Sequence, residues 1–418
     1  MSDSAASSPQ SPAVSTTTRQ PTGSKTDPPL RVAAVIDALT VSGPARQLAA
    51  VAQYLAPHGI EICVVTFLRH GRREAPFVDF MRSSGVSVTV LPDAGPADVA
   101  LIWRVRRALA EYRPDVVQTH GYRPTAIAFA LKRLGASWPW LAFFHGETFE
   151  NRKVRFYNWL DRQLLPSADK LVVMSDAQRQ RFAALQSRVS VVHNAAIPVI
   201  EDPSAVERAR ATLSACRGGR PVLGIVGRLS PEKGVDVLLD AAAMLVRRGM
   251  DFTVIVAGDG PEHTRLESHR ARLGLDERVH FVGALDAVSP VYEALDLLVI
   301  PSLSEGLPNV LLEALRFGVP VVATTVGAIP EVVGSSRAAV LVPPGSAESL
   351  ADGIVRALDG RADPEAVRDR KAAADRLSLE ARGNALARLY GELSPACQVT
   401  DVRAQSGARV REAQSVAS

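Results

Sequence analysis

The 418-residue sequence predicts an α/β protein made of two doubly wound domains in tandem. Short runs rich in Val and Ile alternate with longer segments of helical periodicity, which is typical of parallel strands buried on both faces by crossover helices. This series pauses once near the middle of the chain and then starts again. The length also exceeds one ordinary core and suits two domains that face each other across a cleft.

The first half of the chain predicts one such domain, over residues 30–200. Its expected strands are the apolar runs at 31–36, 60–67, 86–91, 115–119, 140–145, 170–174 and 189–193. Helical periodicity is clearest between them at 45–56, 97–112 and 124–134. The carboxyl ends of parallel strands meet at one edge of a sheet, so the loops that follow these strands are where we expect ligands to bind.

The second half predicts a similar domain, over residues 201–376, after a pause around 195–203 that contains two prolines and two acidic residues. Its expected strands are at 222–227, 252–257, 279–282, 297–301, 319–323 and 339–342, and its helices at 235–248, 263–273, 310–317 and 347–358. A last helix near 379–393, within a segment at 377–394, is expected to pack back on the first domain. The polar residues 395–418 predict a disordered tail.

Composition limits the classes of function. The net charge of +4 and the 5% of aromatic residues are too little for a nucleic-acid platform, but they fit a partner that carries phosphate. Three widely spaced cysteines form neither a disulfide framework nor a zinc site, so we expect a reducing, cytoplasmic compartment. Residues 1–29 are rich in Ser, Thr, Ala and Pro, which predicts a disordered N-terminal segment and no signal peptide. No run approaches 18 apolar residues, so no membrane span is expected.

The loop at 301–314 carries the densest set of candidate binding residues. It connects an expected strand to an expected helix, so its backbone N–H groups lie at a helix N-terminus, where anions bind. Gly306 lets a ligand approach the backbone closely, and Glu305 and Glu313, eight residues apart, are good acceptors for paired sugar hydroxyls. Taken singly, a capping acid or a solvated helix acid explains each glutamate equally well. The combination favours a ligand site.

A second loop, at 227–234, places Arg228 and Lys233 directly after an expected strand. Arg offers a planar fork for phosphate oxygens and Lys a mobile point charge. Two such cations would stabilise the negative charge that develops on a departing diphosphate. A solvated turn with an ion pair to Glu232 is the alternative, and the neighbouring acidic loop makes it the weaker one.

Together these segments resemble glycosyltransferase family 4. The shared pattern consists of Gly-Arg-Leu…Glu-Lys-Gly from Gly227, Ser-Glu-Gly-Leu-Pro-Asn-Val…Glu-Ala from Ser304 and Gly-Ala-Ile-Pro-Glu-Val-Val from Gly327. Members of this family are retaining enzymes of the GT-B fold, which has two Rossmann-like domains. The resemblance extends over roughly residues 31–393 and is strongest in the second half.

The resemblance implies a role for each matching residue. Glu305 would contact the donor-sugar hydroxyls beneath the reacting carbon, Glu313 would hold the ribose hydroxyls, and Arg228 and Lys233 would grip the diphosphate. Further donor contacts are implied along the Gly306 loop and near the base, at Gly306, Leu307, Asn309, Val310, Gly258 and Phe281. Glu331 matches a common family acid, although a first-turn helix acid explains it equally well.

The first domain contributes residues from the opposite side of the predicted cleft. His145 matches the family histidine that faces the sugar, which we favour over a core histidine, whereas His120 is acceptor-side or structural with equal weight. The family's first loop usually carries Gly-Gly-x-Glu, but here it is Val-Ser-Gly-Pro-Ala-Arg over residues 41–46. Gly43 still offers its N–H, and Arg46 is a candidate replacement for the missing contact.

We therefore predict a retaining glycosyltransferase of hexosyltransferase type that uses a nucleotide-diphosphate sugar and no metal. No Asp-x-Asp pair occurs in the chain, so the manganese clamp of the other large transferase fold is not expected. A sugar-nucleotide epimerase, a phosphorylase-like transferase and a non-catalytic sugar-nucleotide-binding protein are the alternatives.

For the acceptor, the resemblance implies polysaccharide or glycolipid synthesis with a glycan, glycolipid or lipid-linked acceptor. Basic and aromatic residues at 103–107 and 152–159 suit contact with the inner face of a membrane, and a solvated helix face explains them equally well.

Overall fold

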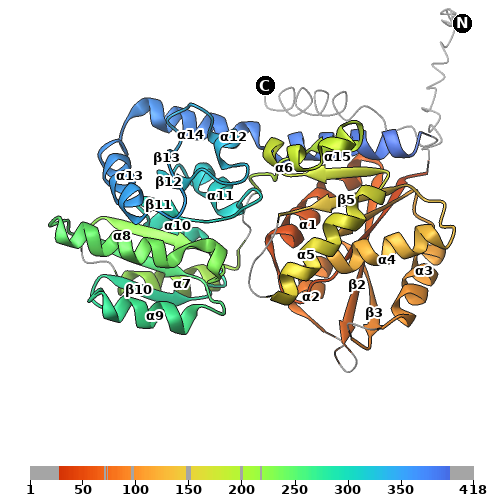
Figure 1. Ribbon diagram of the computed structural model, residues 1–418, viewed down its shortest axis with the longest axis horizontal. Helices are drawn as coiled ribbons and strands as arrows, with labels where there is room; N and C mark the ends of the chain where they lie inside the picture. Colours follow the sequence, from red (N-terminus) through yellow and green to blue (C-terminus); the bar gives the residue numbers. More distant parts are fainter. Residues whose placement is uncertain are drawn as a thin grey trace, which may run out of the picture.

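The computed structural model describes residues 28–69, 72, 74–95, 98–146, 152–197, 201–216 and 219–395. Two α/β lobes lie side by side in it, the N-terminal lobe in red to yellow and the C-terminal lobe in green to blue (Figure 1). The predicted disordered N-terminal segment, up to residue 27, and the predicted tail, from residue 396, lie outside the described residues.

The N-terminal lobe is built on a seven-stranded parallel sheet with the order β3-β2-β1-β4-β5-β6-β7. Its strands are β1 Leu30–Ile36, β2 Ile60–Arg69, β3 Ser87–Asp93, β4 Val116–His120, β5 Trp140–Phe144, β6 Lys170–Val173 and β7 Val189–Val191. Its helices are α1 Gly43–Leu55, α2 Pro76–Ser83, α3 Ala100–Tyr112, α4 Tyr122–Arg133, α5 Arg152–Leu164 and α6 Asp176–Arg181. The strand order reverses direction between β1 and β4, and ligands of such sheets bind at that switch point.

The C-terminal lobe repeats this arrangement with six parallel strands in the order β10-β9-β8-β11-β12-β13. The strands are β8 Val222–Val226, β9 Thr253–Ala257, β10 Val279–Gly283, β11 Leu297–Ile300, β12 Val321–Thr324 and β13 Val340–Val342. The helices are α7 Pro203–Ser214, α8 Val235–Arg247, α9 His263–Arg272, α10 Ser289–Ala294, α11 Asn309–Phe317, α12 Ile329–Val333, α13 Ala347–Asp359 and α14 Pro364–Arg376. The predicted doubly wound α/β architecture is confirmed in both lobes.

Each sheet is covered by helices on both faces. In the N-terminal lobe, α3 and α4 pack with Ala33, Val35 and Val117 on one face, while α1 and α2 pack with Val32, Ala34 and other residues on the opposite face. Alternation of buried side chains along a strand produces these two cores. Most positions in the strands are therefore apolar, which explains why the strands were visible in the sequence.

A last helix, α15 Leu379–Leu393, belongs to neither βα series and lies on the N-terminal lobe (Figure 1). It packs against α1, where Gly383 faces Tyr54 so closely that an added Cβ would lie 2.2 Å from its ring. Tyr390, which is fully buried, donates a hydrogen bond of 2.7 Å to Gln118 Oε1 on β4. The chain thus crosses between the lobes twice, and the two crossings are hydrogen-bonded from Ala196 N to Leu377 O over 2.7 Å.

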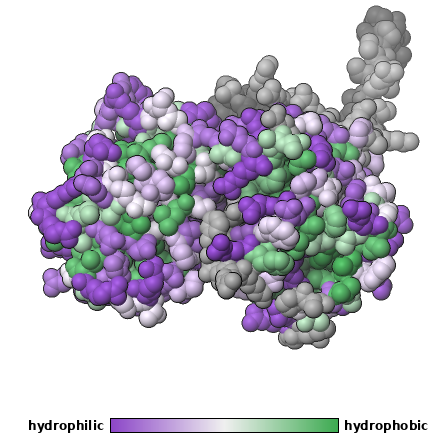
Figure 2. All heavy atoms as spheres, in the orientation of Figure 1, coloured by the Kyte–Doolittle hydropathy of each residue, from purple (hydrophilic) through white to green (hydrophobic). Residues whose placement is uncertain are grey.

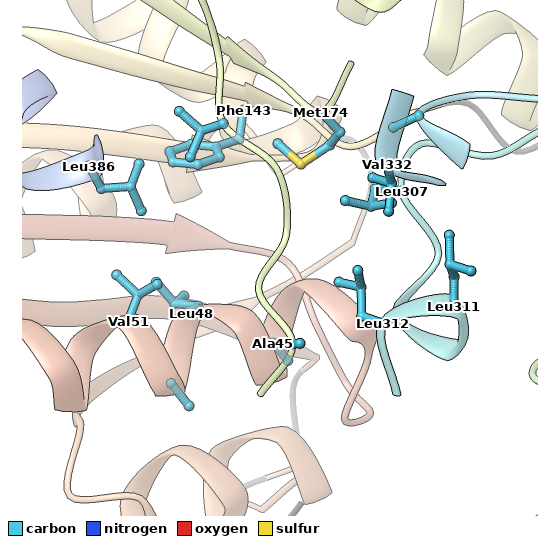
Figure 3. Packing of buried hydrophobic residues seen from close by; sticks show 14 of the residues in the cluster. Ala45, Leu48, Val51, Phe143, Met174, Leu307, Leu311, Leu312, Val332 and Leu386 are labelled. Atoms are coloured by element: carbon cyan, nitrogen blue, oxygen red, sulfur yellow. The ribbon is translucent and has the colours of Figure 1, made fainter. Parts of the chain in front are cut away.

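A continuous apolar cluster joins the two lobes. Figure 3 shows Leu307, Leu311 and Leu312 of the C-terminal lobe beside Ala45 of α1 and Met174 of the N-terminal lobe. All five side chains are buried. Burial of apolar area stabilises such a contact by about 25 cal/mol per Å², so this cluster favours the arrangement in which the lobes meet.

Several helices were absent from the sequence prediction, and α7 shows why. Its buried residues are small and few, namely Ala205, Ala209 and Leu213, so the apolar stripe that identifies an amphipathic helix is narrow. The N-cap residue Asp202 accepts a hydrogen bond from Ser204 N, and Pro203 begins the first turn of the helix. Both residues had been assigned to the interdomain pause. Among the described residues, no helix is long and apolar enough to cross a membrane.

Candidate active site

The predicted donor residues lie on loops at the carboxyl ends of the strands in both sheets. The loop with Lys233 follows β8, the loop with Glu305 follows β11, and Gly43 and His145 follow β1 and β5 in the other lobe. The first two loops are joined by a hydrogen bond of 2.7 Å from Leu303 N to Glu232 O. The structure therefore brings together residues that are far apart in the sequence.

An ion pair between Lys233 and Glu305 lies at the centre of this region. Lys233 Nζ donates to Glu305 Oε1 over 2.7 Å, and Ser302 Oγ donates to the same oxygen over 2.8 Å. A small cavity next to the pair is also lined by Arg228 and Val310. Lys233 is 26% exposed and Glu305 10%, so the pair is partly shielded from water, which strengthens its electrostatic effect. Glu232, the alternative partner of the cations, instead accepts a hydrogen bond from Ser230 Oγ.

Glu313 lies on α11 and is held by residues from both lobes. The hydroxyl of the buried Tyr292 on α10 donates to Glu313 Oε2 over 2.6 Å. Burial and the Glu313 carboxylate together hold the pKa of Tyr292 well above its usual range, so this hydroxyl keeps its proton. Arg46 Nη1 of α1 approaches Glu313 Oε1 at 3.8 Å. Arg46 thus approaches the C-terminal lobe at Glu313; its expected role as a replacement for the missing acceptor contact of the altered first loop stays a prediction.

The N-termini of α1 and α11 meet across the cleft. A Cβ added to Gly43 would lie 2.5 Å from Asn309 Nδ2, so a larger residue there would require the Asn309 side chain to shift. Asn309 Oδ1 accepts hydrogen bonds from Gln47 Nε2 over 3.2 Å and from Asn194 Nδ2 over 3.3 Å. Among the described residues, neither helix has a side-chain cap. Two uncapped N-termini, each the positive end of a helix dipole, are a suitable site for a diphosphate.

The backbones of the two lobes approach each other at Gly306. A Cβ added there would lie 2.3 Å from the carbonyl oxygen of His145, and one added to Gly146 would lie 3.3 Å from Gly306 N. Gly327 packs from the other side, and Gly306 O accepts from Ala328 N over 2.7 Å. From the sequence we expected a ligand to approach the backbone closely at Gly306. In this structure the opposite lobe makes that close approach.

The strand ends of β8, β9 and β10 form a compact backbone platform. Gly227 N donates to Ala257 O over 2.9 Å, and Gly258 N donates to Gly283 O over 2.8 Å. A Cβ at Gly258 would lie 1.8 Å from Gly227 O, so the glycine is required by packing between these loops. The Phe281 ring packs edge-on against His263 of α9, with ring centroids 5.5 Å apart.

His145 and His120 form a hydrogen-bonded pair. His145 Nε2 and His120 Nδ1 are 2.9 Å apart, and the rings stack at an interplanar angle of 18°. Burial lowers the pKa of His145 to about 3, with a further contribution from the charge of Arg382 on α15. Burial, His145 and Arg382 also place the pKa of His120 well below its usual range. Both rings are therefore neutral near pH 7.

Three side chains that position these loops were not identified from the sequence. Gln47 bonds Ala195 in both directions, through Nε2 to the carbonyl over 2.8 Å and through Oε1 from the amide over 2.9 Å. Asn194 Nδ2 donates to Leu307 O over 3.1 Å, so it holds the Gly306 loop against the N-terminal lobe. Tyr292 orients Glu313. The position of Asn194 just beyond a strand end is the one signal that could have identified it.

Glu331 on α12 also connects the two lobes. Its carboxylate accepts from Asp176 N over 2.8 Å and from Ala177 N over 3.0 Å at the start of α6. His193 Nε2 lies 3.6 Å from the same carboxylate. In this arrangement Glu331 contacts the opposite lobe's backbone, in addition to lying in the first turn of its own helix.

Two family models match the two lobes in turn. Residues 42–195 match a "Glycosyl transferase 4-like domain", and residues 220–360 match "Glycosyl transferases group 1". The matched segments contain both sides of the site described above, the first with Gly43 and His145 and the second with Lys233, Glu305 and Glu313.

Curated relatives with similar sequences include two proteins of Streptomyces kanamyceticus. The chain is 37% identical to a 2-deoxystreptamine glucosyltransferase over 43% of its own length and 47% of that protein. It is 33% identical to an α-D-kanosaminyltransferase over 56% of its length and 63% of that protein. A D-inositol 3-phosphate glycosyltransferase of Saccharomonospora viridis is 34% identical over 57% of this chain and 59% of the relative. The chain thus spans about half to three fifths of these relatives.

Solved structures share the fold at low sequence identity. Anabaena HepE in complex with UDP superposes with a TM-score of 0.70 at 21% identity, over 87% of this chain and all of that one. The sucrose-phosphate synthase of Thermosynechococcus elongatus gives 0.70 at 21% identity, over 88% of this chain. These likenesses confirm the predicted GT-B arrangement of two Rossmann-like lobes.

Proposed function

Because this chain belongs to glycosyltransferase family 4 and has the GT-B fold, we propose that it transfers a sugar from a nucleotide-diphosphate donor to an acceptor hydroxyl. The observation that carries this proposal is the Lys233–Glu305 pair, which lies at the strand ends of the C-terminal lobe. A cation for phosphate and an acid for sugar hydroxyls adjoin each other there, as a nucleotide-diphosphate sugar requires.

The donor is assigned to the site in three parts. The diphosphate lies between Lys233, Arg228 and the N-termini of α1 and α11, where two cations and the positive ends of two helix dipoles would attract it. The ribose lies against Glu313, and the base lies over the glycine platform at Gly258. Since Lys233 and Ser302 both donate to Glu305 Oε1, we assign Glu305 Oε2 to the hydroxyls of the sugar.

We propose transfer with retention of the anomeric configuration. The acceptor oxygen forms its bond to the anomeric carbon on the face from which the diphosphate leaves, the bond from that carbon to the diphosphate oxygen breaks, and the acceptor proton passes to a phosphate oxygen. Lys233 and Arg228 stabilise the charge that develops on the diphosphate. These side-chain cations take the place of a metal in the proposal, and addition of EDTA to the assay measures whether a metal contributes.

For the acceptor, we propose a hydroxyl of a cell-surface glycan or a glycolipid. Exposed aromatic side chains lie on the outer helix layer of the N-terminal lobe, at Trp103 of α3 (55% exposed) and at Phe156 and Trp159 of α5. Helices α3, α4 and α5 contact one another in sequence, and hydrophobic residues are interspersed with hydrophilic ones on this side of the lobe (Figure 2). The guanidinium of Arg106 lies 5.4 Å from the Trp103 ring. Aromatic and basic side chains in one layer suit an anionic membrane surface.

A small cyclitol is the second candidate acceptor. Two of the relatives are named for an aminocyclitol or an inositol phosphate acceptor, 2-deoxystreptamine and D-inositol 3-phosphate. Such an acceptor needs no membrane contact and would bind within the cleft, on the side of the N-terminal lobe.

A donor screen followed by product partition tests the proposal. Thermal shift with UDP-, GDP- and ADP-sugars identifies the donor, because a ligand at one hundred times its Kd stabilises the native state by about 2.7 kcal/mol. The radiolabelled donor is then incubated with lipid extract or with the cyclitols. Label in the butanol phase supports the glycolipid, and label in a small water-soluble product supports the cyclitol. Product NMR gives the anomeric configuration. Absence of stabilisation by every nucleotide sugar would refute donor binding.

A further inference from the structure

The family resemblance assigns His145 to the sugar side of the cleft, but the function proposed above gives His120 no chemical role. His120 ends β4 and is only 7% exposed, whereas His145 is partly exposed at the cleft. His120 stacks on Phe143 with ring centroids 4.5 Å apart, so its ring is fixed between Phe143 and His145. A buried polar ring that is held this tightly, next to a candidate catalytic residue, indicates a positioning role.

We propose that His120 fixes the proton of His145 on Nδ1, so that His145 meets the bound substrate as a hydrogen-bond donor and not as a base. The assignment of substrate to this cleft rests on the function proposed above. The assignment of the proton rests on the two rings alone.

The argument starts from the proton that the two rings share. When both rings are neutral, the contact of 2.9 Å between His120 Nδ1 and His145 Nε2 contains one hydrogen. If His145 Nε2 carries it, the proton of His120 must be on its own Nε2. If His120 Nδ1 carries it, His120 Nε2 is a bare acceptor and the proton of His145 is on Nδ1.

The surroundings of His120 Nε2 decide between these two states. This atom is buried and has no hydrogen-bond partner among the described residues. A buried N–H without an acceptor is rarer and less favourable than a buried acceptor without a donor. The favourable state is therefore the one in which His120 Nδ1 donates to His145 Nε2.

The surrounding charge keeps the pair neutral, as this argument requires. Arg382 of α15 is buried, donates to Val192 O over 3.2 Å and also bonds the carbonyl of His193. Its positive charge disfavours a second positive charge on either imidazole, and burial acts in the same direction. Protonation of either ring, which would add a third N–H to the pair, is thus suppressed near pH 7.

The consequence concerns the chemistry of His145. With Nε2 occupied by His120, Nδ1 is the nitrogen of His145 that remains for a ligand at the cleft. Because Nδ1 already has its proton, it can donate to a sugar or phosphate oxygen but cannot accept the proton of the acceptor hydroxyl. His145 then does not compete with the leaving diphosphate for this proton, which agrees with the same-face transfer proposed above.

Nitrogen NMR of histidine tautomers tests this directly. The full-length protein, labelled with ¹⁵N-histidine, is examined at pH 7.5 by long-range ¹H–¹⁵N correlation, and His145→Gln assigns the His145 signals by their loss. We expect a protonated Nδ1 and a bare Nε2 on His145. A protonated Nε2 and a bare Nδ1 would overturn the proposal without any measurement of activity.

Two variants of His120 separate positioning from folding. His120→Asn retains an amide N–H near the place of Nδ1, whereas His120→Leu removes the donor and keeps an apolar side chain. We expect His120→Leu to return His145 to a mixture of tautomers and to lower kcat by about tenfold, the effect of one lost hydrogen bond, with KM for the donor little changed. His120→Asn should restore most of kcat and the Nδ1–H tautomer.

Thermal unfolding of both variants checks that they are folded. If folded His120→Leu keeps both the tautomer and kcat of the unmodified protein, the positioning role is refuted. The unmodified protein and the variants can also all fail to transfer sugar while the NMR spectra are as expected. That result would refute the proposed function and support the proton assignment.

Discussion

Replacement of Lys233 by methionine tests the electrostatic basis of the proposed reaction. Methionine keeps most of the length and the apolar stem of lysine but removes the cation that lies 2.7 Å from Glu305 Oε1. One preorganised donor for developing negative charge typically contributes 10² to 10³ in kcat, or about 2.7 to 4 kcal/mol. Lys233 is 26% exposed and so partly screened, and we therefore expect a decrease near the lower bound, about a hundredfold.

Lys132→Met is a matched control. Lys132 is also 26% exposed and also pairs with a carboxylate, Asp169, at 3.3 Å. It lies near the C-terminal end of α4, at the amino edge of the sheet and away from the strand ends that form the site. We expect this variant to retain both kcat and nucleotide affinity.

The assay measures two quantities for each protein. Isothermal titration with the nucleoside diphosphate gives Kd, and release of the diphosphate from the nucleotide sugar gives kcat, with or without an acceptor. A Lys233→Met enzyme whose kcat and Kd both lie within about threefold of the unmodified enzyme, well below the expected effect, would refute the assignment of this cation to the diphosphate.

Three further predictions follow from the same geometry. Tyr292→Phe removes the hydrogen bond of 2.6 Å to Glu313, so Kd for the nucleotide should rise about tenfold; an unchanged Kd by calorimetry would mean that Glu313 does not hold the ribose. Gly306→Ala places a Cβ 2.3 Å from His145 O, so the lobes should meet less closely, with a larger radius of gyration by X-ray scattering and kcat lower by about a hundredfold; an unchanged radius would argue against this contact in solution. The pKa of His145 is lowered to about 3 by burial and by Arg382, whereas the pKa of an unfolded histidine is near 6.5. At a pH between these two values, the unfolded chain binds a proton at His145 and the folded chain does not. The free energy of unfolding should therefore be smaller at pH 5 than at pH 7.5 by at most about 2 kcal/mol through this group, and urea unfolding should show that this part of the pH dependence disappears in His145→Gln.

The sequence predicted those parts of the fold and site that have a local signature. The bounds of α15 agree with the prediction at both ends, because its start has a Ser378 cap and its apolar positions recur with helical spacing. The loops with Lys233 and Glu305 were identified because several chemically informative residues adjoin one another in the sequence. Helices with a weak apolar stripe, such as α7, were not.

Contacts between the lobes could not be predicted in the same way. Gln47 and Asn309 are 262 positions apart, and nothing in the neighbourhood of either residue indicates the other. The role of His120 likewise depends on which nitrogen faces His145, which is a matter of ring orientation and not of residue type. From the sequence, an acceptor-side role and a structural role were equally weighted for His120. The hydrogen bond between the His120 and His145 rings favours a positioning role.

The return of α15 to the first lobe has a practical consequence for anyone who divides this protein into fragments. A fragment cut at residue 200 would contain every strand of the first sheet and still lack a buried part of its own core, including Leu386, Ala387 and Tyr390. The complementary fragment would contain a helix with an exposed apolar face and no surface to cover it, which favours aggregation. A self-sufficient first lobe would instead require α15 to be fused after residue 197 by a short linker, since Ala196 and Leu377 already lie side by side.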